Sequence, residues 1–399
     1  MIKFLDTNVL LQLNNEDDIV ICHTSLLELE QIKSSYNKDQ EVKARARHVL
    51  KWIYENEAKI TIVPDNVDAA NELGLELSPD VIICSTAYWF SKSYKLEFVT
   101  LDLSCRFIAQ HLFGLKTVIP KLDRTDYKGF KEVYLTHDEL SDFYLNKDNR
   151  FELLTNEYLI ISTEGEGIVD SLRWAGDSYQ QLTRTKIDTK WFNKMKPKDI
   201  YQTCLIDSIL NNTITAISGL AGSGKTLIAL MSAMYLIEKG SYDRIVILFN
   251  PTKARGATDM GYYGGDFLDK ALQNSIGHIL TTKFGDRYAV DVLLRDNKLK
   301  LVSMADCRGM EIGDNEILWI TEAQNTSKDL IKLCLSRVSS GAKVIIEGDY
   351  LSQVDSHSFE GFNNGLLAVI EAFKGHEEFG YVELQNVHRS RLAELAQLL

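Results

Sequence analysis

The clearest chemical pattern in the sequence is a glycine-rich segment that ends in a lysine and a threonine. It reads GLAGSGKT and matches the pattern G-x-x-x-x-G-K-[ST] in full, between an apolar run and a long run with helical spacing. This setting favours a phosphate-binding loop, in which backbone N–H groups surround nucleotide phosphates. The lysine then supplies charge for the outer phosphates, and the threonine hydroxyl can ligate Mg²⁺. The alternative is a glycine-rich turn that merely starts a helix. The residues expected to bind nucleotide are Gly219, Gly222, Ser223, Gly224, Lys225 and Thr226.

Two later apolar runs end in polar residues that suit hydrolysis of a bound nucleotide. The run ILWITEAQN contains Glu322, which is expected to orient or deprotonate the attacking water. The run AKVIIE is followed by Asp349 and Gln353, with Asp355 beyond, and an acid with an amide at such a point can sense the γ-phosphate. The open alternatives are a polar helix cap after the first run and an ordinary polar turn after the second.

A C-terminal arginine is a further candidate for the same site. Arg389, in the segment VHRSRL, is expected to reach the phosphates of a nucleotide on its own chain or on a neighbouring subunit. An exposed structural arginine is the alternative that the sequence leaves open.

Four acids in the first third of the chain suggest a second chemistry. Asp6 and Asp102 each end an apolar run of strand type, while Glu28 and Asp80 lie near the starts of expected helices. Strand ends of a parallel sheet meet at one edge, so these carboxylates are expected to converge there. Carboxylates so close together need a cation, and their oxygens suit one or two Mg²⁺ or Mn²⁺ ions that activate water against a phosphodiester. Taken singly, each acid is better explained as a helix cap or turn residue, so the metal-site reading depends on the four together.

The elements that must position these residues fall into three segments. Residues 1–125 alternate short apolar runs with helical stretches, which predicts an α/β domain with a parallel sheet. Strands are expected at FLDTNVLL, IVICHT, LEFVTLD and LKTVI, and a helix at EVKARARHVLKWIYE. Residues 126–198 read as short strands joined by turns, which predicts a small, mostly β domain. Residues 199–399 return to the α/β pattern, with strands at NTITAISG, RIVILF, EILWIT and AKVIIEG.

Composition bounds the class of protein. The 399 residues are 45% hydrophobic and 25% charged, which excludes a disordered or collagen-like chain. No apolar run approaches the length of a membrane span, and the N-terminus lacks the pattern of a secretory signal. The six cysteines form no CxxC pair, so reduced thiols and a cytoplasmic location are expected. The net charge of −12 means that binding to nucleic acid requires local basic surface or metal ions.

The C-terminal half resembles the PhoH-like ATPases, a P-loop family related to superfamily 1 helicases. The resemblance is carried by GLAGSGKTLIAL, NPTKARGATDMGYYGGD, CRG, TEAQN, SRVSSGAKVIIEGD and HRSRLAELAQLL. It implies a RecA-like fold, ATP as the nucleotide, and Gln202 as a reader of adenine. The chain departs from the family pattern at Thr321, where an Asp is usual, and at Asn250-Pro251, where Arg-Pro is usual. The spacing from Asp349 to Gln353 is also one residue longer here.

The first 120 residues resemble a PIN domain, a small metal-dependent ribonuclease fold. The segments DTNVLL, LLELEQIK, PDVII and VTLD occur in the family's order. The resemblance implies a metal site at Asp6, Glu28, Asp80 and Asp102. It also implies supporting roles for Thr7 and Asn8, and places Ser104 where PIN domains often carry another polar residue.

The order of the segments resembles known PIN–PhoH fusion proteins over nearly the whole chain. This implies ATP-driven RNA unwinding, metal-dependent RNA cleavage and assembly into a ring, usually a hexamer. The basic residues Lys43, Arg47 and Lys51 follow at four-residue spacing on one expected helix, and form either an RNA-tracking stripe or a solvated face. One rival is a nucleotide-switched RNA-binding protein with weak or no catalysis. Another, a P-loop small-molecule kinase, is disfavoured because no arginine-rich lid follows the loop.

Overall fold

The chain folds into two compact units, Met1–Leu122 and Asp123–Leu399, and each is described by itself. The computed structural model describes residues 2–11, 19–35, 40–118, 125–182, 187–191, 193–250, 280–282, 284–285, 287–355, 359 and 361–388. The finer division into three domains, with boundaries at 125 and 198, stays a prediction. No helix in these ranges is long and apolar enough to cross a membrane.

The first unit is built on a five-stranded parallel sheet with the order β3-β2-β1-β4-β5. Its strands are β1 (Ile2–Leu5), β2 (Ile19–Cys22), β3 (Ile60–Val63), β4 (Leu96–Val99) and β5 (Thr117–Val118). The chain builds outward from β1 first to β2 and β3, and then on the other side to β4 and β5. The crevice beyond the carboxyl ends of β1 and β4 is therefore the switch point, where sheets of this kind place their sites.

Helices cover both faces of this sheet. They are α1 (Thr7–Leu10), α2 (His23–Ser34), α3 (Gln40–Glu55), α4 (Asp68–Glu72), α5 (Pro79–Ser91) and α6 (Leu103–Phe107), with short η1 (Glu57–Lys59) and η2 (Ile108–Leu112) turns. Because side chains alternate along a strand, Phe4 packs with α4, α5 and α6, whereas Leu5 packs with α1, α2 and α3. A strand lies at each of the four predicted positions, and the helix over EVKARARHVLKWIYE is confirmed, but within FLDTNVLL the residues Thr7–Leu10 form α1 rather than strand. β3 was not predicted, because its four residues form an edge strand whose two central side chains are exposed.

The second unit contains a six-stranded parallel sheet with the order β14-β13-β15-β16-β12-β17. Its strands are β12 (Ile214–Gly219), β13 (Arg244–Phe249), β14 (Leu299–Ser303), β15 (Glu316–Ile320), β16 (Lys343–Glu347) and β17 (Phe379–Leu384). The four strands predicted for this half are confirmed as β12, β13, β15 and β16. β17 comes from the C-terminal end of the described chain yet pairs with β12.

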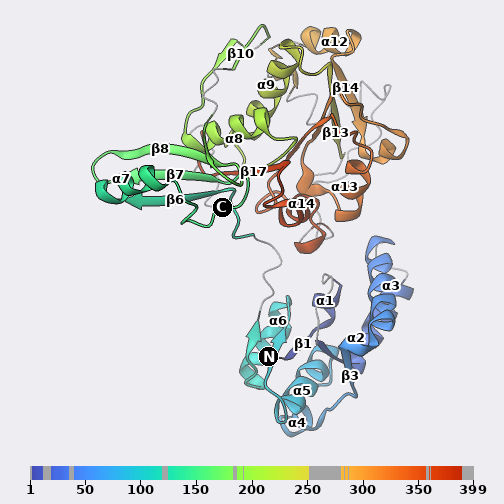
Figure 1. Ribbon diagram of the computed structural model, residues 1–399. Helices are drawn as coiled ribbons and strands as arrows, with labels where there is room; N and C mark the ends of the chain where they lie inside the picture. The colour runs from blue at the N-terminus through green and yellow to red at the C-terminus, as the bar shows by residue number, and fades with distance from the viewer. Residues whose placement is uncertain are drawn as a thin grey trace. The chain divides into compact units, whose positions relative to one another are not determined.

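Two helical layers enclose this sheet (Figure 1). Its helices are α8 (Ile200–Asn211), α9 (Lys225–Glu238), α12 (Arg287–Arg295), α13 (Lys328–Leu335) and α14 (Gly365–Phe373), with η3 (Met304–Gly309), η4 (Ala323–Asn325) and η6 (Gly361–Asn363) as short turns. Ile245 and Ile247 face the layer of α8, α9 and α12, while Val246 and Leu248 face the layer of α13 and α14. A chain buried on both faces explains why these strands read as continuous apolar runs.

A small sheet with the order β6-β7-β8-β9 precedes the large one. Its elements are β6 (Phe130–Leu135), α7 (His137–Asn146), β7 (Tyr158–Thr163), β8 (Gly167–Trp174) and β9 (Tyr179–Gln181), and a hairpin of β10 (Ile187–Thr189) and β11 (Asn193–Met195) follows. The reading of THDELSDFYL as strand and turn is wrong, because these residues form α7. Thr136 and Glu139 make a capping box at its start, a helix signal that the aromatic residues obscured.

The small sheet shares its core with the large one. Phe130, Tyr158 and Ile160 belong to the same apolar cluster as α8 and α9. Polar side chains join the two as well: the Tyr158 hydroxyl donates to Asp207 at 3.0 Å, and Arg173 lies 3.3 Å from the same carboxylate. Asp207 is 1% exposed. The small sheet is therefore an integral part of the second unit.

Candidate active sites

Asp6 lies at the switch point of the first unit's sheet, immediately after β1. It caps α1: its Oδ1 accepts the Thr7 N–H at 2.6 Å, and its Oδ2 accepts the Thr100 hydroxyl at 2.7 Å. The side chain is buried, and burial raises its pKa to about 6. The two hydrogen bonds oppose that rise, whereas the charges of Asp80 and Glu28 add to it.

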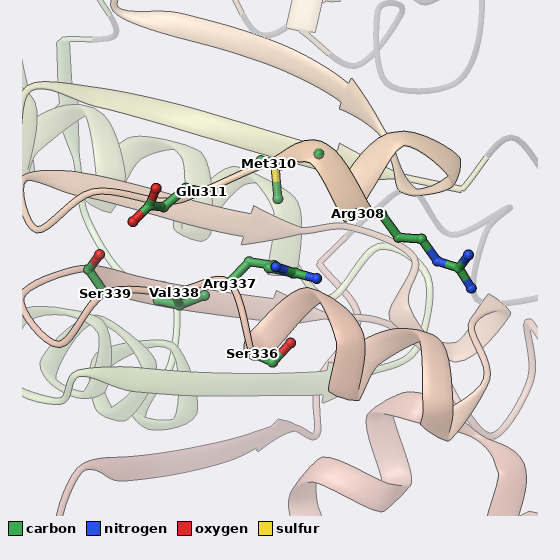
Figure 2. Close-up of a pocket in the computed structure, with 8 residues that line it drawn as sticks. Arg308, Met310, Glu311, Ser336, Arg337, Val338 and Ser339 are labelled. Carbon is green, nitrogen blue, oxygen red and sulfur yellow. The ribbon is translucent and has the colours of Figure 1, made fainter.

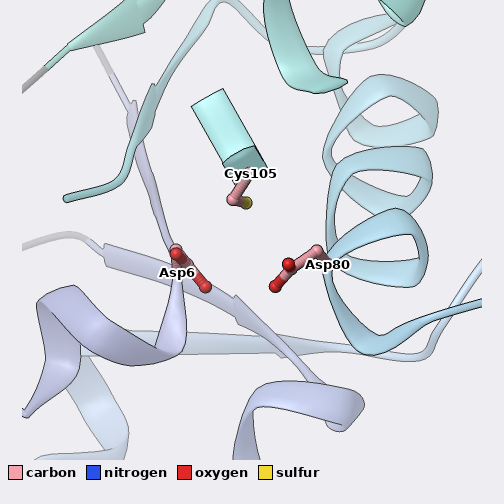
Figure 3. Close-up of side chains that lie close together, drawn as sticks. All are labelled: Asp6, Asp80 and Cys105. Carbon is pink, nitrogen blue, oxygen red and sulfur yellow. The ribbon is translucent and has the colours of Figure 1, made fainter. Parts of the chain in front are cut away.

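Asp80 and Cys105 complete a tight group with Asp6. Asp80 lies in the first turn of α5, which Ser78 caps and Pro79 opens, and Cys105 lies in α6. One carboxylate oxygen of each acid and the Cys105 Sγ all lie within 4.8 Å of one another. Figure 3 shows the three side chains pointing toward a common centre from separate elements. The pKa of Asp80 is raised by burial and by Asp102.

Glu28 and Asp102 flank this group. The Thr7 hydroxyl donates to Glu28 at 2.5 Å, and burial together with Asp80 raises the pKa of Glu28. Asp102 is exposed and caps α6 by accepting the N–H groups of Ser104 and Cys105. The four predicted acids therefore lie close enough for the charge of one to affect its neighbours, although only Asp6 and Asp80 belong to the tight group. Asn8 accepts the Leu101 N–H at 3.2 Å and so ties the end of β1 to the segment after β4.

Thr100 and Cys105 are the residues of this site that the sequence reading missed. Thr100 joins the two acids that follow β1 and β4, because its hydroxyl donates to Asp6 and also accepts the Asp102 N–H at 3.0 Å. Its position in VTLD, two residues before the acid, was the available signal. The Cys105 thiol is buried against Cys84, 3.7 Å away, and this neighbour and burial raise its pKa well above the ordinary value. Cys105 is therefore an uncharged side chain beside the two acids.

The donor set of this crevice fits a hard divalent cation. Carboxylate oxygens are the ligands that Mg²⁺ and Mn²⁺ prefer. The neighbouring negative charges raise the pKa values of these acids, and a bound cation would lower them. A bound cation would supply an activated water. The protein's own contribution is to hold Asp6 and Asp80 at fixed positions through Thr7, Thr100 and the start of α5.

The glycine-rich loop of the second unit joins β12 to α9. Gly222 and Gly224 adopt φ values of 89° and 99°, which residues with a Cβ rarely reach, and Gly224 is the N-cap of α9. The loop therefore directs backbone N–H groups and the helix N-terminus toward one point, as phosphate binding requires. Lys225 folds back over the loop, donating to the carbonyl oxygens of Gly219 at 2.6 Å and Leu220 at 3.1 Å.

Gln202 supports the loop from behind. It is 5% exposed, and its amide donates to the Ser223 carbonyl at 2.9 Å while accepting the Lys198 N–H at 2.8 Å. These hydrogen bonds do not test the predicted contact of Gln202 with adenine, which stays a prediction. His388 lies on the loop as well, because its N–H donates to the Gly222 carbonyl at 3.1 Å. The prediction for Arg389, the next residue, lies outside the described residues, as does that for 251–266.

Glu322 and Asp349 follow β15 and β16, and Gln324 connects them. Gln324 donates to the Glu322 carboxylate at 2.6 Å and accepts the Asp349 N–H at 3.0 Å. Glu322 has a φ of 50°, a conformation that costs energy for a residue with a Cβ and is typical of functional positions. The Asp349 carboxylate accepts the N–H groups of Leu351 and Ser352, which closes its own turn. Sequence reading missed Gln324, although it stands in TEAQN.

Gln353 contributes to this connection through its backbone. Its carbonyl oxygen accepts the Gln324 amide at 3.1 Å, while its side chain is exposed. Asp355 pairs with Asn325 at 2.6 Å, and Asn250 donates to the Asn325 carbonyl at 2.7 Å. The polar residues after β13, β15 and β16 thus form one hydrogen-bonded group around η4.

Two further side chains, Thr321 and Glu347, lie at these strand ends. The hydroxyl of Thr321 faces the Leu248 carbonyl at 3.4 Å. Glu347, the last residue of β16, is 4% exposed, and burial raises its pKa to about 8. The charge of Glu322 adds to that rise, whereas Lys225, the nearby Thr226 hydroxyl and the Trp319 indole oppose it.

A pocket with two arginines lies elsewhere in the second unit (Figure 2). It has a volume of 480 Å³ and forms where the chain after η3 runs beside the chain after α13. The Ile312 N–H donates to the Arg337 carbonyl at 2.9 Å, which holds the two segments together. The exposed side chains of Arg308 and Arg337 line the pocket. Neither guanidinium forms an ion pair with a residue of the described ranges, so both are available to an anion.

Comparison with known proteins identifies a family for each of the two parts of the chain. Residues 194–398 match the family described as PhoH-like protein, and residues 4–118 match the PIN domain. Protein PhoH2 of Bacillus subtilis (strain 168) is 28% identical, with 99% of this chain and 98% of that protein covered. Protein PhoH2 of Mycolicibacterium smegmatis is 28% identical over 50% of this chain and 46% of its own. A PhoH-like protein of Mycobacterium leprae is 29% identical over 48% of this chain and 54% of its own.

These matches fix the family. PhoH-like proteins are P-loop ATPases and PIN domains are nucleases, families that generally use nucleotide and divalent metal. The P-loop and the carboxylate crevice lie inside the respective matched ranges. Since the first match spans just over half of the sequence, this chain belongs to the PhoH-like protein family and carries a PIN domain ahead of its P-loop domain.

Proposed function

We propose that this protein is an ATP-dependent RNA helicase and ribonuclease. ATP with Mg²⁺ binds at residues 219–226, Glu322 orients or deprotonates the attacking water, and Asp349 and Gln353 sense hydrolysis. Cycles of hydrolysis move or unwind RNA and present single strands to the carboxylate crevice, which cleaves them with Mg²⁺ or Mn²⁺.

The observation that carries this proposal is that two groups of polar side chains, one in each unit, suit two different chemistries. Asp6 and Asp80 form a cluster suited to a divalent cation, and Lys225 and Glu322 follow the glycine-rich loop and β15 in the other unit, where a nucleotide site is proposed. A chain with both groups can hydrolyse a nucleotide and cleave a phosphodiester. The polarity of the crevice favours phosphodiester chemistry, because carboxylate-held metal ions stabilise the oxygens of such a displacement.

RNA requires basic contacts on an otherwise acidic protein. We place some of them at the arginine pocket, where Arg308 and Arg337 can each hold a backbone phosphate, as arginine's donor geometry favours. In the first unit Lys43, Arg47 and Lys51 lie along α3, and Lys51 also pairs with Glu55 at 3.6 Å. We further propose a homo-oligomer, a hexameric ring, in which Arg389 completes a nucleotide site. Light scattering at several protein concentrations tests that assembly.

Cleavage of a labelled single-stranded RNA tests the nuclease directly. The RNA is incubated with Mn²⁺ or Mg²⁺, with and without ATP, using wild type and Asp6→Asn. Metal-dependent cuts that disappear in the variant are expected, and an effect of ATP on wild type shows that the two halves are coupled. Absence of cleavage with either metal would contradict the nuclease assignment.

A nucleotide-switched RNA-binding protein with little catalysis is the second candidate. The orientation of Thr321 favours it, because a hydroxyl that faces the Leu248 carbonyl leaves the end of β15 without a metal-positioning acid. On that view Thr321→Asp raises ATP turnover markedly. If turnover by the variant does not rise, position 321 does not limit hydrolysis and the first candidate is retained.

A further inference from the structure

Glu347 is a buried acid to which the mechanism above gives no role. It ends β16 with 4% of its surface exposed, and its Oε2 has no hydrogen-bond partner within the described part of the chain. Leaving a buried polar atom unsatisfied is costly, and the opposing effects of Lys225, Thr226 and Trp319 do not outweigh burial, which still raises the pKa of Glu347. Such a side chain therefore points to a partner that joins it when the protein acts.

The position of Glu347 identifies the site that it serves. β16 lies between β15 and β12, and Glu347 pairs in register with Ile217, just before the glycine-rich loop. Side chains alternate along the strand, so Glu347 shares the face of Ile345, which is the face that α9 covers. The first turn of α9 carries Lys225 and Thr226, and both influence the charge on Glu347.

The neighbouring strand lacks the acid that such a site needs. Thr321 follows β15 directly, one strand further from the loop, and its hydroxyl faces the Leu248 carbonyl. Position 321 therefore carries no carboxylate, and the carboxylate of Glu322 next to it is held by Gln324, whereas Glu347 has no other explained role.

We propose that Glu347 supplies the carboxylate that positions the nucleotide's Mg²⁺, as a ligand of the ion or of its bound water, in place of an acid at position 321. The inference rests on the proposed nucleotide site. A carboxylate oxygen and the Thr226 hydroxyl are the hard ligands that Mg²⁺ takes beside phosphate oxygens. The assignment leaves Glu322 free to act on the attacking water.

The experiment measures metal affinity rather than turnover. Mn²⁺ binding to the complex of the full chain with ADP is followed by electron paramagnetic resonance for wild type and Glu347→Gln. We expect the variant to bind Mn²⁺ 10–100-fold more weakly, on the order seen when metal-supporting groups are removed. Binding of ADP in EDTA should be unchanged or tighter, because the variant removes a negative charge beside the phosphates.

Two further variants separate this role from a structural one. Glu383→Gln removes the same charge from β17, the other neighbour of β12, and should leave Mn²⁺ affinity unchanged. Adding Thr321→Asp to Glu347→Gln should restore Mn²⁺ affinity, since an acid returns at the adjacent strand end. A loss due only to altered packing would not be repaired in this way, even if Glu347→Gln lowers the melting temperature.

The outcomes distinguish the inference from the proposed function. Mn²⁺ affinity within twofold of wild type in Glu347→Gln overturns the role of Glu347 while the nucleotide site stands. Equal weakening of ADP binding with and without metal also overturns it, because a structural role predicts that pattern. Failure of wild type to bind ADP at all overturns both.

Discussion

At the scale of single residues, Asp6 shows that forming the site lowers the stability of the folded protein. Its carboxylate is buried, and its raised pKa means that the folded protein holds the proton more tightly than the unfolded chain does. Ionised Asp6 therefore destabilises the metal-free protein. That destabilisation is fully present above about pH 6 and disappears as the pH falls below the ordinary pKa of an aspartate.

The variant Asp6→Asn should consequently stabilise the metal-free protein at pH 8. A shift of two pKa units corresponds to about 3 kcal/mol, and loss of the bond from Thr100 offsets about 1 kcal/mol. We expect a net gain of about 2 kcal/mol at pH 8 and none at pH 4, measured by chemical denaturation in EDTA. Added Mn²⁺ should reverse the order by stabilising wild type. Equal stability of the two proteins at pH 8 would show that Asp6 is not strained.

Gly348 allows the contact between Gln324 and Asp349. A Cβ on Gly348 would lie 2.2 Å from the Gln324 Oε1, so Gly348→Ala must displace Gln324 from Glu322 and from the turn after β16. We expect a loss of stability of about 1–3 kcal/mol and a larger fractional loss of ATP turnover than of ADP affinity. Gly313→Ala is the control, because its added Cβ meets only ordinary contacts. Full turnover in Gly348→Ala would mean that Gln324 does not hold Glu322 for catalysis.

Residues of the two sites were predictable from the sequence where a short motif identifies them, and not where their role depends on contacts with distant parts of the chain. The P-loop and the acids after β1 and β4 follow from short motifs and from the rule that parallel strands end at one edge. Thr100 and Glu347 could not be found in this way. Their roles depend on which strands are neighbours and on their register, and those pairings join residues far apart in the chain.

At the scale of elements, the arginine pocket exists because the ends of η3 and α13 are paired. We expect the double variant Arg308→Gln with Arg337→Gln to bind single-stranded RNA more weakly, by a similar factor for every RNA sequence. The slope of log affinity against log salt should fall by about 1–2, because two phosphate contacts are removed. The control is Arg295→Gln, an exposed arginine beside Asp296 at 3.6 Å. An unchanged salt slope in the double variant would place the RNA elsewhere.

The elements also show where pattern reading fails. Strands buried on both faces, such as β13 and β16, were recognised because they are short and continuously apolar. β3 was missed as an exposed edge strand, and α7 was misread because its capping box at Thr136 and Glu139 was outweighed by aromatic residues. In both cases the deciding information is exposure or capping, which a hydrophobic pattern does not include.

At the scale of the whole molecule, the two units predict a division of labour. Lys225→Ala should abolish ATP turnover and unwinding, yet retain metal-dependent cleavage of RNA that is already single-stranded, since the carboxylate crevice lies in the other unit. Asp6→Asn should do the opposite. Both are measured on one preparation by phosphate release and by RNA cleavage. Loss of basal cleavage in well-folded Lys225→Ala would contradict separate activities.

The shared core of the second unit determines where the chain can be divided. A fragment that begins at residue 123 keeps Tyr158 and Arg173 on Asp207 and should unfold cooperatively. One that begins at residue 199 removes these two partners from Asp207 and Phe130 from the core, so it should be insoluble or unfolded. Circular dichroism during heating distinguishes them. A cooperative transition in the shorter fragment would show that the small sheet is dispensable.

The bonds from Tyr158 and Arg173 to Asp207 also bear on how such a chain can be recombined with others. The P-loop sheet and the small sheet share one core, so an exchange of genetic segments at the start of α8 would separate the P-loop sheet from residues that pack against it. Crossovers before residue 123 carry no such penalty. The N-terminal unit is therefore the part that can be exchanged by recombination, or by an engineer, while the core of the P-loop unit stays intact.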